Sequence, residues 1–386
     1  MSTHERSVPF AGDALEAATA LARTAAEPHV VHENGTTVHF AEGAAETVAD
    51  SPADAARRSG RTVYGWVSFD RAGHFAVPRT EIRFRDGTAL LRADDEAALD
   101  VLEKRLADVS TVDVVEARVL APVRTHGADE YRSAVGAAVA EIQAGLLDRV
   151  VLSRTVPVPE EVDFTATHLA GRRGRDPARS YLLRLGGWEV LGFEPEVVIG
   201  VDGAGGVVAR LPGPPGGEPV FDVAWREEPC PAATAVFGHA IAVRLVAAEL
   251  AAVCEPGSVR VADFPVAEVT GTLSAGRTSW DAVAVLLPAV TASGVPKARA
   301  CALIDRVEPG RGPYGGAVVL AEPDGALDVT PVLRGVFRHR GRTWLRAGAD
   351  VAAKPGRELA ETTEKLRGVS RFLVPLGAWG RERGET

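Results

Sequence analysis

The sequence predicts an α+β protein built on large, mainly antiparallel sheets. Short β-rich segments follow one another through glycine turns typical of hairpins, and helical segments stand between them. No repeat of 20–50 residues and no low-complexity tract occurs. At roughly 150 residues per domain, 386 residues correspond to two or three domains or to one large one.

Residues 1–122 are expected to form a first half of the fold, integrated with the rest. A short amphipathic helix is expected over 13–24 and a helix with an acidic first turn over 94–109. Strand-like segments lie between them at 29–40, 61–71 and 80–93, with turn signals at Asn34-Gly35, Arg71-Ala72-Gly73 and Asp86-Gly87. The polar stretch 117–130 is the best candidate for a subdomain boundary.

Residues 123–386 are expected to form the second half. Helices are predicted over 130–148, 237–254 and within 355–373. Residues 212–231 are too rich in proline for a regular element and are expected to form a long surface loop. Strands are predicted at 149–159, 180–187, 188–202, 205–211, 315–337 and 342–349, with a turn at 338–341.

The composition of the chain argues against nucleic-acid binding, membrane insertion and a disulfide-stabilised fold. With 43 Lys and Arg against 52 Asp and Glu, the net charge is −9, so a nucleic-acid partner is not expected. No uncharged apolar run of 18 residues and no signal-like N-terminus is present, so we expect a cytoplasmic protein without a membrane partner. The sparse cysteines Cys230, Cys254 and Cys301 argue against a disulfide framework and a thiolate metal site.

The predicted last helix carries the most informative charged residues. The usual phosphate-loop, dinucleotide, zinc-protease and serine-hydrolase motifs do not occur. Glu358, Glu361 and Lys365 stand at i, i+3 and i+7 and therefore share one helix face. Two such carboxylates can hold Mg²⁺ directly or through water, and the lysine can meet an anionic substrate. Alternatively, the face is solvated and Glu361 simply pairs with Lys365.

Several motifs in order resemble the chorismate-utilising enzymes, the family of the anthranilate, aminodeoxychorismate, isochorismate and salicylate synthases. The likeness extends from about residue 130 to 374 and is greatest to the salicylate synthase branch. It rests on VVLSR (150–154), LGFEPEVV (191–198), the segment 286–319 that contains TASGVPKA and GPYGG, and RTWLRAGA (342–349). The resemblance implies two stacked α/β halves, a bound dianion and Mg²⁺, and no glutamine amidotransferase partner.

The resemblance also implies roles for single residues. Arg334 and Tyr314 match the pair that grips the pyruvyl carboxylate, and an arginine fork suits a carboxylate. Gly348 matches the turn that receives the ring carboxylate, and Thr291 matches a substrate-contacting threonine. For metal binding and catalysis, the matches are Glu361 as a direct Mg²⁺ ligand, Glu358 as a ligand through water, and Glu196 as the acid that protonates the departing C4 hydroxyl.

Other positions depart from the family pattern. Arg149 stands where water-adding members have a lysine base, and a guanidinium is not deprotonated in proteins. Asp350 replaces the last glycine of a Gly-Ala-Gly turn, which adds a negative charge near the expected ring carboxylate. The remaining departures are Pro214 and Pro215 for a threonine and an arginine, Ala235 and Gly238 for two metal-binding glutamates beside His239, and Thr272 for a ring-facing histidine.

Three functions agree with this pattern. The first is a diverged enzyme with no Mg²⁺ or only weakly bound Mg²⁺, which acts on chorismate, isochorismate or a related carboxylated ring by lyase, isomerase or pericyclic chemistry in specialised metabolism. Arg149 would then stabilise charge rather than act as a base. The second is a Mg²⁺-dependent salicylate or isochorismate synthase with substitute ligands among Glu218, Asp222, Glu227 and Glu228. The third is a protein that binds the ligand without turnover.

Overall fold

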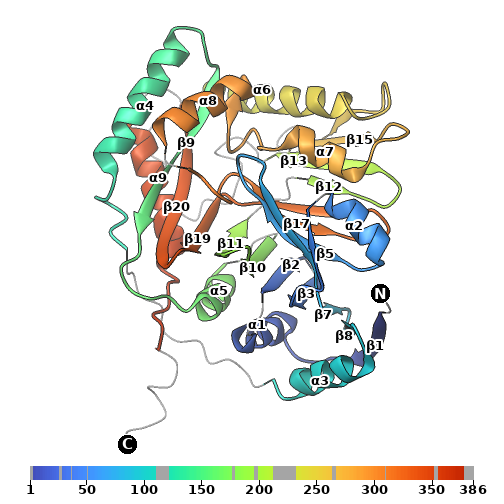
Figure 1. The fold of residues 1–386 in the computed structure, drawn as a ribbon. Coiled ribbons are helices and arrows are strands. Elements are labelled where there is room, and N and C mark those ends of the chain that lie inside the picture. The colour runs from blue at the N-terminus through green and yellow to red at the C-terminus, as the bar shows by residue number, and fades with distance from the viewer. Residues whose placement is uncertain are drawn as a thin grey trace, which may run out of the picture.

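The chain forms two antiparallel sheets that pack face to face, with helices outside (Figure 1). The computed structural model describes residues 3–25, 28–35, 37–49, 51–109, 121–175, 179–194, 199–211, 232–262, 267–308, 310–351 and 355–377. Strands from both sides of residue 122 take part in both sheets. The predicted α+β class with large antiparallel sheets is confirmed.

The first sheet has eleven strands, and all neighbouring pairs are antiparallel. In spatial order they are β1 (His4–Pro9), β8 (Thr88–Ala93), β7 (Thr80–Arg85), β3 (Thr37–Glu42), β2 (His29–Asn34), β10 (Arg179–Leu185), β11 (Trp188–Glu194), β19 (Arg334–His339), β20 (Arg342–Val351), β9 (Arg149–Pro157) and β16 (Gly294–Val295). The predicted Asp86-Gly87 turn joins β7 to β8, and both residues have the positive φ that a tight hairpin requires.

The second sheet has nine strands, which are also antiparallel throughout. Their order is β14 (Arg260–Ala262), β15 (Ala267–Thr272), β13 (Gly206–Leu211), β12 (Ile199–Val201), β18 (Leu327–Pro331), β17 (Ala317–Ala321), β5 (Val63–Val67), β6 (Gly73–Val77) and β4 (Glu46–Val48). Between the sheets, apolar and aromatic side chains of both inner faces form a third core layer that includes Tyr314.

Nine helices are described, in three groups of three (Figure 1). One group covers the outer face of the first sheet: α1 (Ala14–Thr24), α3 (Glu96–Ala107) and α5 (Phe164–Arg173). A second group covers the second sheet: α2 (Pro52–Ser59), α6 (Ala232–Ala251) and α7 (Ser279–Leu286). The third group packs around β9 and β20: α4 (Ala128–Gln143), α8 (Lys297–Val307) and α9 (Pro355–Ser370).

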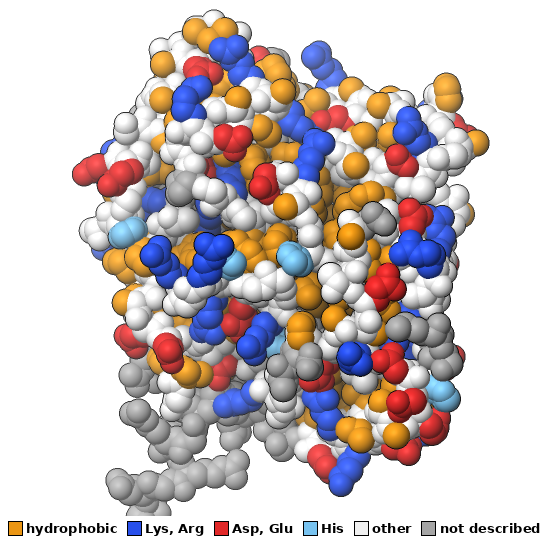
Figure 2. Space-filling model, viewed as in Figure 1, with side chains coloured by type: hydrophobic (Ala, Val, Ile, Leu, Met, Phe, Trp, Pro, Cys, Tyr) orange, Lys and Arg blue, Asp and Glu red, His pale blue; other side chains and the backbone are white. Residues whose placement is uncertain are grey.

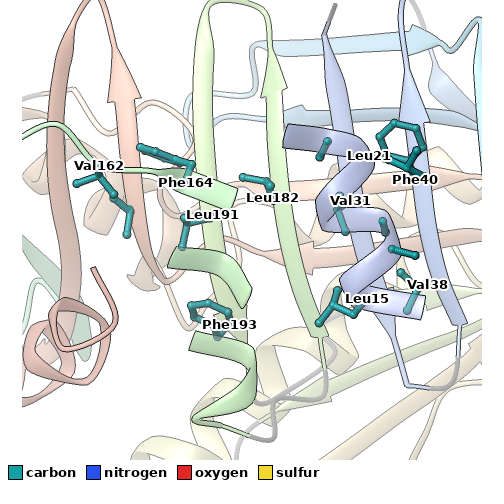
Figure 3. Packing of buried hydrophobic residues seen from close by; sticks show 14 of the residues in the cluster. Leu15, Leu21, Val31, Val38, Phe40, Val162, Phe164, Leu182, Leu191 and Phe193 are labelled. Atoms are coloured by element: carbon teal, nitrogen blue, oxygen red, sulfur yellow. The ribbon is translucent and has the colours of Figure 1, made fainter. Parts of the chain in front are cut away.

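The outer core of the first sheet shows why α1 forms where its spacing predicts. Leu15 and Leu21 of α1 project onto the strands beside Val31 and Phe40 (Figure 3), and all four side chains are at most 7% exposed. Asp13 caps the helix by accepting a hydrogen bond from the backbone N–H of Glu16. Capping and one-sided burial together fix the position of this helix.

Several predicted elements differ from the structure. The segment 315–337 forms three strands, β17 and β18 in the second sheet and β19 in the first. The segment 188–202, expected as one strand, forms β11 in the first sheet and β12 in the second. Pro195 stands between them in the sequence and has no N–H to donate to a ladder. The helix expected over 237–254 begins five residues earlier, at Ala232, and ends at Ala251. The proline-rich segment 212–231 lies outside the described residues.

Surface properties agree with the composition. Acidic and basic side chains are interspersed over the face shown in Figure 2. None of the helices in the described part of the chain is both long and apolar enough for a membrane crossing. Cys254 and Cys301 are free thiols, and Cys230 lies outside the described residues.

Candidate active site

The candidate site is built on the paired strands β9 and β20. Gly348 lies opposite Ser153, and Asp350 lies opposite Val151. Because side chains alternate along a strand, Arg346, Gly348 and Asp350 share one face of β20. Arg346 stacks over Tyr314 of the layer between the sheets, so this shared face is the inner one.

Tyr314 and Gly348 are brought close together, and Arg334 lies on the neighbouring strand β19. Tyr314 is 1% exposed, and its hydroxyl lies so close to Gly348 that a Cβ there would be 2.4 Å from Oη. Only glycine therefore fits this point of β20 without a shift. Arg334 begins β19 directly opposite Ala347 and is half-buried. Tyr314 and Gly348, which the resemblance assigns to the two carboxylates, thus lie together on the inner face, whereas Arg334 pairs with Ala347, whose side chain belongs to the outer core.

Arg149 and Asp350, two positions that the sequence analysis expects to depart from the family pattern, are paired with each other. Arg149 Nη2 lies 3.0 Å from Asp350 Oδ2, across the antiparallel β9–β20 ladder. Burial raises the pKa of Asp350; Arg149 opposes this rise, whereas Glu361 adds to it. Because the arginine and the aspartate neutralise each other, the substitutions form one charge pair rather than two separate changes.

Helix α9 brings its charged face to β20. Lys365 Nζ lies 2.7 Å from Glu361 Oε1 and donates a hydrogen bond of 2.8 Å to the carbonyl oxygen of Gly348. The Glu361–Lys365 pair of the alternative interpretation is therefore present. Glu358, however, is only 2% exposed, so the face is not simply a solvated one. In this structure Lys365 supports the Gly348 turn.

The described residues do not form a complete magnesium site. Glu358 and Glu361 come from one helix, and the carboxylate of Glu361 is already neutralised by Lys365. Within the described ranges, no third Asp, Glu, His or Cys joins them in a group that could hold a metal ion. A Mg²⁺ ion at Glu361 would have to compete with an ammonium group for the same oxygen. The donors that the described residues offer are therefore two carboxylates of α9, one of which pairs with Lys365.

Thr291 lies beside the same strands. It belongs to the turn before β16, where the backbone N–H of Val151 donates to Ser293 O at 2.8 Å. Its hydroxyl oxygen is closed off from solvent and has no hydrogen-bond partner among the described residues. This geometry is compatible with the predicted contact to a ligand, and that role remains a prediction.

Sequence reasoning missed a buried ionic network beneath the site. Both oxygens of Glu308 accept hydrogen bonds from Arg311, one oxygen also accepts from Arg346, and Ser153 donates through its N–H and its hydroxyl. Burial alone would raise the pKa of Glu308, but Arg311, Arg346 and Ser153 outweigh it and lower the pKa. The signal was present in the Glu308–Arg311 spacing of i, i+3 within the family-like motif.

The structure does not bring every predicted position into this cluster. Thr272 is exposed at the end of β15 opposite Gly206, and its backbone N–H donates a hydrogen bond of 3.2 Å to Ser258 Oγ. Ala235 and Gly238 lie in the first part of α6, where side chains are not described, and His239 is buried there at 6% exposure. Outside the described residues lie Glu196, Pro214, Pro215, Glu218, Asp222, Glu227 and Glu228.

Comparison with known proteins assigns the family. The chain matches the sequence model of the chorismate binding enzyme family over residues 11–211 and 238–371. It belongs to this family, whose members use chorismate, and the sequence-based resemblance is confirmed.

Individual relatives of the chain include salicylate, anthranilate and isochorismate synthases. The chain is 39% identical over 325 residues to a salicylate synthase of Mycolicibacterium paratuberculosis, and the alignment covers 78% of this chain and 69% of that protein. It is 32% identical to an anthranilate synthase component 1 of Spirochaeta aurantia, over 72% of this chain and 62% of the relative. Among solved structures, the menaquinone-specific isochorismate synthase MenF of Escherichia coli superposes with a TM-score of 0.75 at 19% identity, over 97% and 95% of the two chains. This structural likeness supports the fold.

Proposed function

We propose that this chain is a diverged, salicylate-synthase-like lyase or isomerase that works without Mg²⁺. Its substrate would be chorismate, isochorismate or a related carboxylated ring, transformed by a pericyclic reaction. We place it in specialised metabolism and in the cytoplasm, and we expect no glutamine amidotransferase partner. Family membership and the similarity to a salicylate synthase support the substrate class.

The Arg149–Asp350 ion pair is the observation that carries the proposal. A water-adding enzyme needs a base at the position of Arg149, as the family resemblance implies. A guanidinium cannot serve, because it stays protonated in proteins, and here it is also held 3.0 Å from a carboxylate. Arg149 therefore supplies no base, and a reaction in which no external base removes a proton suits this site.

Pericyclic reactions meet this condition. In pyruvate elimination from isochorismate, the ether C–O bond breaks while the C2 hydrogen moves to the methylene carbon of the enolpyruvyl group, which gives salicylate and pyruvate. In the rearrangement of chorismate, a C–C bond forms as the ether C–O bond breaks. Both proceed within one molecule, so the protein mainly enforces a reactive conformation and stabilises charge.

The retained residues have the properties that this task requires. Arg334 and Tyr314 would hold the pyruvyl carboxylate, and the Gly348 turn would hold the ring carboxylate through backbone N–H groups. Lys365 fixes that turn through its 2.8 Å hydrogen bond to Gly348 O. The buried Glu308 network holds Arg346 against Tyr314, which keeps the tyrosine in place. Together these contacts make a rigid anion-binding frame.

A product assay tests the proposal. Purified protein is incubated with chorismate and, separately, with isochorismate, in EDTA and in millimolar Mg²⁺, and products are identified by liquid chromatography and mass spectrometry. We expect pyruvate with salicylate, or prephenate, at equal rates in both buffers. Products from chorismate only with Mg²⁺ would indicate the alternative metal-dependent synthase. Tight binding of either compound without any product would indicate a binding protein.

A matched pair of variants links the product to the site. Arg334→Lys keeps the charge but loses the bidentate fork, and we expect kcat/KM to fall by about 10²-fold or more. Arg342→Lys makes the same change at an exposed position at the other end of β20, and activity should stay within about twofold. Equal activities of the two variants would contradict the assignment of Arg334.

A further inference from the structure

We propose that Asp350 is a specificity-determining hydrogen-bond acceptor, which selects ligands that carry a hydroxyl or amino donor on the ring. The inference rests on the proposed function, since it concerns the ligand of that same site. It gives a function to Asp350, which stands where the family resemblance leads us to expect a glycine.

The two oxygens of Asp350 have different surroundings. Oδ2 is held by Arg149 at 3.0 Å. Oδ1 is closed off from solvent and accepts no hydrogen bond from any residue in the described ranges, although 45% of the whole side chain is exposed. A covered carboxylate oxygen without a donor is costly, and in a native protein such a group requires an explanation, of which a bound donor is one. The arginine thus orients the carboxylate and leaves one acceptor free.

The position of Asp350 places Oδ1 beside the residues that we expect to bind the ligand. Asp350 lies two residues from Gly348, on the same face of β20 and therefore on the side of Tyr314. Lys365 and Glu361 of α9 are close enough to influence its ionisation. A ring held at Gly348 would therefore present one of its substituents to Asp350.

The charge of Asp350 determines which substituent is accepted. A carboxylate facing Oδ1 would be repelled, and a hydrogen or methyl group would leave the oxygen without a donor. A hydroxyl donates a hydrogen bond to it, and an amine does so with the help of charge if it is protonated. Asp350 does not act as a metal ligand in this interpretation, because it forms no metal-binding group with Glu358 and Glu361 in the described part of the chain.

Binding of simple ring acids tests the inference without turnover. Affinities of benzoate, the three hydroxybenzoates and the three aminobenzoates are measured by calorimetry for the wild type, Asp350→Gly and Asp350→Asn. We expect at least one hydroxy or amino isomer to bind the wild type about tenfold more tightly than benzoate. This advantage should fall below about twofold in Asp350→Gly and be intermediate in Asp350→Asn, which keeps one acceptor oxygen.

Two results would overturn the inference: no substituted isomer exceeds benzoate in the wild type, or the advantage persists unchanged in Asp350→Gly. Glu268→Gln serves as the control, since it alters the exposed Arg210–Glu268 pair away from the site and should leave all affinities unchanged. Thermal unfolding of each variant verifies that it is folded. Because these probes do not react, the outcome is independent of whether chorismate or isochorismate is turned over.

Discussion

Replacing Glu308 by glutamine should destabilise the protein and disturb the site above it. The side chains of Arg311 and Arg346 are each 2% exposed, and Glu308 is the carboxylate that both contact. Removing one member of a buried ion network costs about 3–5 kcal/mol, because the remaining charges stay buried without compensation. With an unfolding entropy of about 2.1 cal/mol/K per residue, 386 residues give about 0.8 kcal/mol/K, so Tm should fall by about 4–6 °C.

Differential scanning calorimetry of Glu308→Gln beside Glu268→Gln measures this effect. The control removes a charge from the exposed Arg210–Glu268 pair, whose charged atoms are 2.8 Å apart. Such a pair contributes about 1 kcal/mol or less to the free energy of unfolding. Its Tm should therefore stay within about 1 °C of the wild type. If Glu308→Gln also melts within 1 °C of the wild type, the reasoning about the buried network is wrong.

The same variant has a predicted pH dependence. The pKa of Glu308 is lowered from its ordinary value of 4.5, so the folded state binds fewer protons than the unfolded state in that range. The ionised carboxylate therefore contributes its full stability above about pH 4.5 and loses it as the pH falls through the folded pKa. The Tm difference between wild type and Glu308→Gln should be constant from pH 6 to 8 and shrink below pH 4.5. A difference that grows on acidification would contradict the sign.

Two further variants test the site itself. Gly348→Ala places a methyl group 2.4 Å from Tyr314 Oη and 3.0 Å from Leu152 O. We therefore expect kcat/KM to fall at least about tenfold and the free energy of unfolding to fall by about 1–3 kcal/mol. Unchanged steady-state kinetics would refute this packing. Glu361→Gln should leave the rate in millimolar Mg²⁺ within about threefold of the wild type, because the carboxylate pairs with Lys365 rather than with a required metal. A loss of two orders of magnitude in the Mg²⁺ buffer, with no wild-type activity in EDTA, would show that the metal interpretation is correct.

The fold could be predicted from the sequence to a large extent. Hairpin signals such as Asp86-Gly87 and the amphipathic spacing of 13–24 are local, and local patterns survive in the structure as a turn and as α1. The assignment of strands to sheets could not be predicted in this way. Segment 188–202 divides between two sheets because tertiary packing decides which face each part covers.

The candidate site was predictable as a set of residues but not as a set of contacts. Family-like motifs named Tyr314, Gly348 and Asp350, yet a motif does not reveal that Tyr314 Oη abuts Gly348. The Arg149–Asp350 pair depends on the register of β9 against β20, which joins residues 201 positions apart. Register is set by which side chains are buried and by distant turns, and neither can be read from the two segments alone.

The fate of one hydrogen atom tests the central claim most directly. Isochorismate labelled with deuterium at C2 is incubated with the protein in EDTA, and the pyruvate released is analysed by mass spectrometry. A pericyclic elimination predicts pyruvate that carries one deuterium in its methyl group, formed at the same rate with and without Mg²⁺. Pyruvate without deuterium, or pyruvate formed only when Mg²⁺ is added, would contradict the proposed base-free and metal-free chemistry.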